Sequence, residues 1–179
     1  MSDSALRDHF SAMARNSAWS NHRLLTACEQ LTDEEFAQKR TSFFPSIQLT
    51  LNHNLIVDHI YMADMIGKGR QNVGIEGDVP FPKASDLKRA QEEFDISLIE
   101  FCDGLSPEDL DRVISITWRT GDTSQEPIRL VLSHLFVHQI HHRGQAHAML
   151  AGTQVPPPQL DEFFLNYDKP RRQGELFTQ

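Results

Sequence analysis

Apolar residues recur at steps of three and four positions in four long segments of the chain. In the first segment no glycine or proline interrupts the pattern, which runs through Leu6, Phe10, Met13, Ser17, Leu24 and Cys28. Such spacing places the apolar side chains on one face of a helix. The pattern therefore predicts four long helices, at residues 4–30, 46–67, 85–104 and, after a cap at residues 123–127, up to Gly152.

Shorter pieces with start signals of their own lie between the long segments. Thr32 and Glu35 have the spacing of a capping box, and Ser106 followed by Pro107 is typical of a helix start. Residues 68–84 are rich in Gly, Pro and Asn, and they form a predicted loop of about 17 residues, a length that is often functional or mobile.

Residues 113–119 (VISITWR) are β-branched and alternate in polarity, as a strand would. Because the sequence offers no obvious second strand, we expect an extended connection here.

These elements predict an all-α fold, a four-helix bundle with a long crossover loop and short extra helices, in which the long helices pack antiparallel. With 179 residues, the chain is long enough to bury one core. We expect a single domain at residues 1–168 and a polar C-terminal tail at residues 169–179.

Composition narrows the classes of function. The net charge of −8 argues against binding of a nucleic-acid backbone, which needs clustered Lys and Arg. No apolar run approaches the length of about 18 residues that a membrane helix needs, and the N-terminus lacks a signal-peptide pattern. We therefore expect a soluble cytoplasmic protein without a nucleic-acid or membrane partner. Cys28 and Cys102 have no CxxC spacing and are expected to be buried free thiols.

The last long helix carries most of the candidate chemistry. Five of the nine histidines lie between His134 and His147, and His134, His138 and His142 are spaced four apart. On a helix such residues share one face, and two imidazoles at this spacing can bind one metal ion. They can equally be hydrogen-bonded core residues.

A third ligand would have to come from another helix. His53 lies on an apolar stripe of the second long helix, whereas His59 is expected outside or at an edge. Bundles build metal sites from facing helices, so His53 with a histidine pair of the last helix is a plausible site. Spacing alone does not decide between the pairs His134/His138 and His138/His142.

The chain resembles the DinB family of bacterial helical bundles, which is related to YfiT-like metalloenzymes and thiol-dependent transferases. The resemblance is carried by NSAWSNHRLL at residues 16–25, TLNH at residues 50–53 with Asp58 and Tyr61, HLFVHQIHHRGQAHAMLAG at residues 134–152, and PPQLD at residues 157–161. Tyr61 stands where the family often has Trp.

The resemblance implies that His53, His138 and His142 bind one Ni²⁺ or Zn²⁺ per chain, and that the protein is a homodimer. His134 is then expected to make a buried hydrogen bond or to support the ligands from outside. His141 is expected in a structural or interface role, and His22 and His147 at the periphery.

Neighbouring residues of the same blocks carry further expectations. Asp58 is a candidate for orienting a histidine, although its angle from His53 makes a direct bond doubtful. Arg143 either anchors an anion or pairs with carboxylates, and the second role is the commoner one in an acidic protein. Trp19 is expected in the core, and Gly144 is expected to have a close packing partner.

Two functions follow from these residues. A divalent ion on three imidazoles can activate water or a thiol, which fits a metal-dependent enzyme, a thiol-dependent S-transferase or a hydrolase of small molecules. The alternative is a non-catalytic metal-binding protein of the stress response. The sequence shows no HExxH glutamate and no other obvious general base.

Overall fold

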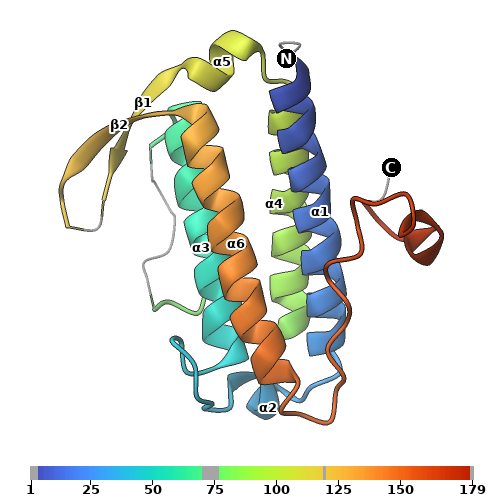
Figure 1. Ribbon diagram of the computed structural model, residues 1–179. Helices are drawn as coiled ribbons and strands as arrows, with labels where there is room; N and C mark the ends of the chain where they lie inside the picture. The colour runs from blue at the N-terminus through green and yellow to red at the C-terminus, as the bar shows by residue number, and fades with distance from the viewer. Residues whose placement is uncertain (1–3, 70–76, 119, 178–179) are drawn as a thin grey trace.

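The computed structural model describes residues 4–69, 77–118 and 120–177, and the chain folds as a helical bundle (Figure 1). This confirms the predicted four-helix bundle with short extra helices. The long helices lie close to their predicted ranges, at α1 Ser4–Cys28, α3 Ile47–Ile66, α4 Ala84–Asp103 and α6 Ile128–Leu150.

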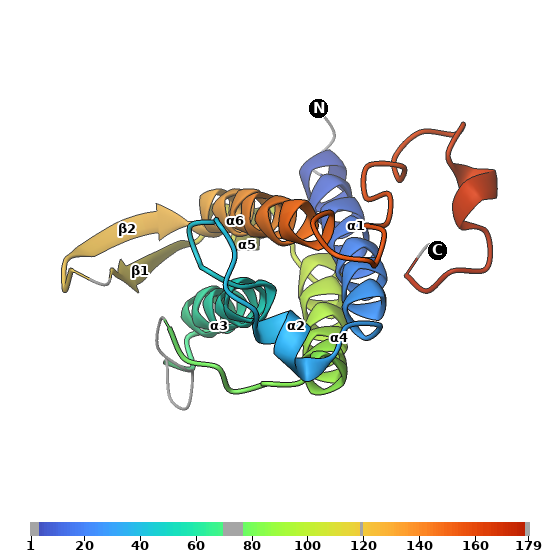
Figure 2. The same ribbon diagram turned by 90° about the horizontal axis from the view of Figure 1, so that it is seen from below.

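The bundle is built from two antiparallel helix pairs. α1 packs along α4, and α3 packs along α6 (Figures 1 and 2). α3 and α4 run in the same direction, so the chain between them must return along the whole bundle (Figure 1). A helix of 20 residues such as α3 is about 30 Å long, which explains the long crossover loop. Residues 70–76 of that loop lie outside the described residues. The expectation that the loop is functional or mobile falls on this part and stays a prediction.

Local capping sets the helix ends where the sequence predicts them. Thr32 forms the expected capping box with Glu35 at the start of α2 (Asp33–Ala37), and Ser106 forms another with Asp109 at α5 (Pro107–Asp111). Gly67 ends α3 with a φ of 69°, a left-handed conformation that glycine adopts without steric cost.

The prediction of an extended connection at residues 113–119 is wrong. Strand β1 (Val113–Thr117) pairs antiparallel with β2 (Thr123–Pro127) in a hairpin before α6. The partner strand was missed because TSQEP is polar and resembles a helix cap. Ile114 and Ile116 of β1 are buried against the bundle, so packing stabilises a strand pair that would be marginal by itself.

Apolar side chains from all four long helices fill the core. Trp19 of α1 is buried as predicted. Cys28 and Cys102 are free and fully buried, as expected, and burial raises the pKa of each thiol to about 12. Among the described residues, no helix combines the length and the apolar character needed to cross a bilayer.

A network of buried polar side chains also crosses the interior and joins the four long helices. Its members are Ser17 and Asn21 of α1, Asp58 of α3, Gln91 and Asp95 of α4, and Gln139 and Arg143 of α6. Buried polar groups need such partners, because an unpaired one loses its hydration without compensation.

Two fully buried carboxyl groups accept most of these hydrogen bonds. Gln139 Nε2 donates to Asp58 Oδ2 at 2.8 Å, and Gln91 Nε2 donates to Asp58 Oδ2 at 3.3 Å and to Asp95 Oδ1 at 3.1 Å. Asn21 Nδ2 lies 3.1 Å from both oxygens of Asp95. Burial, the dominant cause, raises the pKa of both Asp58 and Asp95 to about 7.

Arg143 supplies the positive charge of the network. Its Nη1 donates to Ser17 Oγ at 2.6 Å and to Asn21 Oδ1 at 3.1 Å. The guanidinium is electrostatically coupled to Asp58 and Asp95. One cation with two carboxyl groups is neutral when one carboxyl keeps its proton, and this agrees with the raised carboxyl pKa values.

The Asp58→Asn variant should flatten the pH dependence of stability between pH 4 and pH 7. In the folded protein Asp58 holds its proton more tightly than in the unfolded chain. The stabilisation that this tighter proton binding adds to the folded protein is therefore fully present below about pH 4 and is lost as the pH rises to about 7. The asparagine side chain cannot ionise, so the stability of the variant relative to the wild type should rise across this range, by an amount on the order of 1 kcal/mol or more.

Urea unfolding at several pH values measures this difference. Glu34→Gln, a change at an exposed residue outside the network, is the control and should keep the wild-type slope. Equal slopes in Asp58→Asn and the wild type would show that Asp58 ionises normally in the folded protein.

Candidate metal centre

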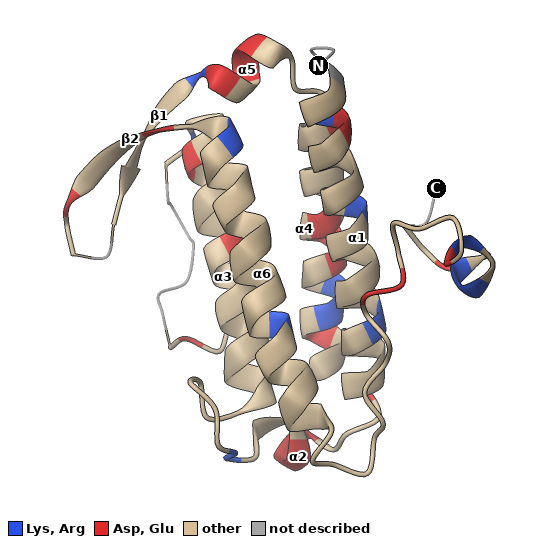
Figure 3. Ribbon diagram, viewed as in Figure 1, with Lys and Arg blue, Asp and Glu red and all other residues tan. Residues whose placement is uncertain are grey.

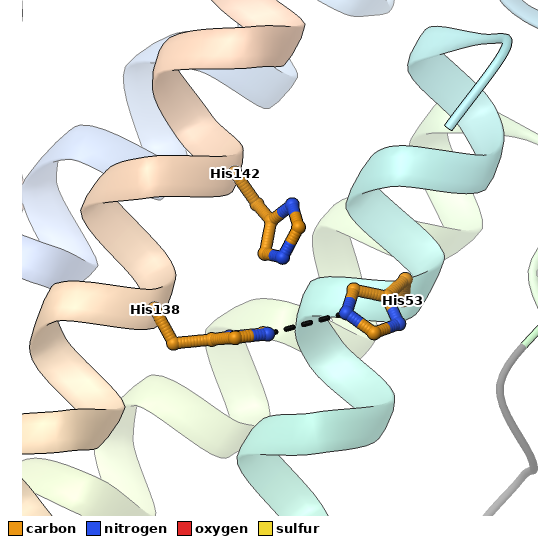
Figure 4. A group of neighbouring side chains, drawn as sticks. All are labelled: His53, His138 and His142. Carbon is orange, nitrogen blue, oxygen red and sulfur yellow. Dashed lines mark hydrogen bonds between the residues drawn. The ribbon is translucent and has the colours of Figure 1, made fainter. Parts of the chain in front are cut away.

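Three histidines from two facing helices converge at one place beside the core (Figure 4). His53 comes from α3, and His138 and His142 come from α6. Each offers one nitrogen, and these three atoms lie within 4.8 Å of one another. The Nε2 atoms of His53 and His138 are 3.2 Å apart. The cluster that the sequence predicted is therefore assembled, and it could hold a metal ion.

Helix geometry explains the convergence. His138 and His142 are one turn apart on α6, and their ring centroids are 4.4 Å apart. His53 faces them because α3 packs along α6, and its ring lies 4.7 Å from that of His142. His53 and His142 are buried and His138 is half-buried.

The distance between His53 and His138 is compatible with a shared metal ion as well as with a hydrogen bond. Two nitrogens at about 2.0–2.1 Å from one tetrahedral ion lie about 3.3 Å apart, close to the 3.2 Å between His53 Nε2 and His138 Nε2. A hydrogen bond would use that pair of nitrogens and leave His142 out. A metal ion uses a lone pair from all three imidazoles.

The protonation states also suit metal binding, which requires neutral imidazole. Burial, followed by the nearby His142, lowers the pKa of His53 to about 4. Burial and the neighbouring imidazoles lower the pKa of His138 to about 3. Burial also lowers the pKa of His142. At neutral pH each of these histidines therefore has a lone pair available.

Gln145 orients the ring of His142 from one turn further along α6. Its Oε1 lies 2.9 Å from His142 Nδ1, and its Nε2 lies 3.0 Å from His141 Nε2. An amide oxygen only accepts, so Nδ1 of His142 carries the proton and Nε2 is free to coordinate. Among the described residues, Nδ1 of His53 and Nδ1 of His138 have no hydrogen-bond partner.

Sequence analysis missed two residues that shape the centre. Phe44, in the segment before α3, packs its ring 4.3 Å from that of His53 and 5.6 Å from that of His142. Asn52, next to His53, exchanges two hydrogen bonds of 2.9 Å with the backbone of Phe81. Asn52 thereby ties the crossover to α3 beside the cluster. The available signal for Asn52 was its place beside the candidate His53 in the TLNH motif, whereas nothing in the sequence marked Phe44.

His134 does not join the cluster. It is exposed, and its ring packs against Tyr61 at 5.4 Å and Trp118 at 6.4 Å. The expected buried hydrogen bond is therefore wrong. The reason is the drift of about 40° for each step of four residues, which turns His134 toward the solvent when His138 and His142 face α3.

The remaining histidines lie outside the centre. His59 is exposed and packs against Phe94. His22 Nδ1 pairs with Glu92 at 2.7 Å, and His147 Nε2 donates to the carbonyl of Pro158 at 2.9 Å. His141 is exposed and contacts the ring of His142.

Three neighbouring residues have outcomes that the sequence left open or misjudged. Asp58 accepts hydrogen bonds from Gln139 and Gln91 and makes none with a histidine among the described residues, so it does not orient one directly. Arg143 belongs to the network of buried carboxyl groups. The packing partner expected for Gly144 is absent among the described residues, since nothing in them lies within 4 Å of a Cβ placed there.

The chain is similar in sequence to a curated protein and in fold to a solved structure. The uncharacterized protein YizA of Bacillus subtilis (strain 168) is 27% identical over 122 residues, which are 67% of this chain and 72% of that protein. A crystal structure of a DinB-like protein from Bacillus cereus ATCC 10987 has a TM-score of 0.62 and 20% identity, and covers 80% of this chain and 91% of that chain. This likeness supports the fold.

The family itself is shown by a match along most of the sequence. A model of the DinB family matches residues 1–173. The resemblance seen in three helical segments is thereby confirmed, and the chain belongs to the DinB family.

Proposed function

We propose that this protein binds one divalent transition metal ion, Ni²⁺ or Zn²⁺, through His53, His138 and His142. We further propose that it is a metal-dependent enzyme that acts on small molecules, as a thiol-dependent S-transferase or a hydrolase. The observation that carries the proposal is the convergence of three neutral imidazole nitrogens within 4.8 Å. Three protein ligands are typical of catalytic sites, which leave a coordination position open.

The chemistry that a bound divalent ion supplies is the activation of a water or a thiol by lowering its pKa. The chain's own residues hold the three imidazoles neutral, orient His142 through Gln145, and cover His53 with the ring of Phe44. Phe44 is itself buried and packs against one side of the cluster.

A non-catalytic metal-binding role in a stress response is the second candidate. It is favoured by the composition of the cluster, because the described residues contribute no carboxylate or thiol to it that could act as a general base. Turnover of thiol-transfer or hydrolysis substrates by metal-loaded protein, absent from the metal-free form, would favour the enzyme. Tight metal binding without turnover would favour the second role.

His138→Ala and His142→Ala should each abolish stoichiometric metal binding. Removal of a ligand should cost at least as much affinity as the loss of an outer partner, which is about 10- to 100-fold. Elemental analysis of dialysed protein without a histidine tag, followed by titration with Zn²⁺ and Ni²⁺, measures the effect.

His134→Ala is the matched control for these variants, since it removes an imidazole from the same helix but outside the cluster. It should retain about one metal per chain. Full metal content in either His138→Ala or His142→Ala would show that this residue is not a ligand.

We also propose that the protein is a homodimer that associates through the outer face of α6. Leu130, Val137 and Ile140 on this helix are 49%, 65% and 50% exposed. α6 has only Arg129 and Arg143 as charged residues (Figure 3), and Gly144 leaves room for a close approach. Exposed apolar patches of this kind are typical of interfaces.

Val137→Glu should convert the dimer to a monomer, because it places a charge in the centre of the proposed apolar contact. Light scattering after size exclusion gives the molar mass, to be compared with the chain mass of 20.5 kDa. Ile96→Glu, the same type of change on the exposed side of α4, should leave the mass unchanged. A monomeric wild type, or a Val137→Glu dimer, would contradict the assignment.

A further inference from the structure

A cavity lies between the segment that precedes α3 and the C-terminal part of α6. It has a volume of about 410 Å³ and is lined by Arg40, Thr41 and Ser42 on one side and by Gln145 and Met149 on the other. This volume falls within the range of small-molecule sites, about 300–1,000 Å³. We refer to it as the Arg40 groove.

The charge of Arg40 is not neutralised by the described part of the protein. Its Nη1 donates to Gln38 Oε1 at 3.1 Å and its Nη2 to the carbonyl of Glu35 at 2.9 Å, both neutral acceptors. Its Nε has no hydrogen-bond partner among the described residues. A guanidinium has five N–H donors, so donors of Arg40 remain for a ligand.

Several other arginines of this acidic protein do have carboxylate partners. Arg15 pairs with Asp103 at 2.8 Å, and Arg129 pairs with Asp111 at 2.7 Å. No carboxylate among the described residues forms such a pair with Arg40. An arginine that lines a cavity and lacks a carboxylate is suited to an anionic ligand, since the guanidinium matches carboxylate and phosphate oxygens.

Gln145 connects the groove to the metal centre. It lines the groove, and its side chain holds Nδ1 of His142 at 2.9 Å. It follows His142 by three residues, which is about 4.5 Å along the helix. The segment that carries Arg40, Thr41 and Ser42 into the groove also carries Phe44, whose ring packs on His53 and His142.

We propose that the Arg40 groove binds the anionic group, carboxylate or phosphate, of the small molecule that reaches the three-histidine centre. Arg40 supplies the charge, and the hydroxyl groups of Thr41 and Ser42 supply further donors. Its role as a substrate site rests on the proposed function. Anion binding by itself does not require the metal, so the two can be tested separately.

The test is an NMR titration of metal-free protein with inorganic phosphate and, in a second arm, with acetate. Chloride at equal ionic strength is the reference. Saturable shifts of the Gln145 side-chain amide and of the Thr41 and Ser42 backbone amides are expected. Arg40→Gln should weaken binding by about tenfold or more, the usual effect of losing a charged hydrogen bond. Lys39→Gln removes a neighbouring exposed charge outside the groove and should change the affinity for the anion by less than about twofold.

A second pair of variants keeps the test valid if Arg40→Gln does not fold. Thr41 is exposed in the loop that lines the groove. Thr41→Glu should weaken anion binding by charge repulsion, whereas Thr41→Gln, similar in size and uncharged, should retain it.

The outcomes separate the possible ligands and the two proposals. Saturation by phosphate alone identifies a phosphorylated ligand, and saturation by acetate alone identifies a carboxylic acid. Shifts no larger than those with chloride would contradict the proposal that the Arg40 groove binds an anion. Equal anion binding by Thr41→Glu and Thr41→Gln would contradict it as well. Saturable binding in a protein that takes up no metal would support the groove and reject the metal centre.

Discussion

The hydrogen bond from Gln139 to Asp58 fixes how α6 meets α3, and the three-histidine cluster depends on that contact. The bond is 2.8 Å long and both side chains are fully buried. A rotation of α6 about its axis would break this hydrogen bond between two buried polar groups, which is costly in an interior of low dielectric constant. Gln139 is the next residue after His138, so the same contact sets the direction of that imidazole.

Two faces of α6 contact two different parts of the interior, the polar network and the three-histidine cluster. Gln139 and Arg143 face the network between the helix pairs, whereas His138 and His142, each one position earlier, are turned by about 100° toward α3 and Phe44. The paired spacing of four residues in both sets keeps the two faces in register along the helix. The network thus supports the cluster by holding α6 without contributing a group to it.

The segment before α3 links the parts of the proposed active site. It carries Phe44 onto the histidine rings, places Arg40 at the adjacent groove, and supplies Ser46 as the cap of α3. One loop therefore places an aromatic ring, a positive charge and a helix cap at the same end of the bundle. In proteins generally, binding and catalytic residues are often found on loops that a rigid scaffold positions.

Periodicity, capping and i,i+4 spacing are local properties, so the sequence was enough to predict the helices, most of their caps, the bundle, and His53 and His138 as candidate ligands. Its resemblance to the DinB family also selected His142 over His134. Tertiary structure alone decided the hairpin partner at Thr123–Pro127, the exposure of His134, the place of Phe44, and the pairing of Asp58 with Gln139. Those features depend on which segments meet in space. The polar strand Thr123–Pro127 pairs with β1, and Phe44 packs on His53, only once the helices have packed.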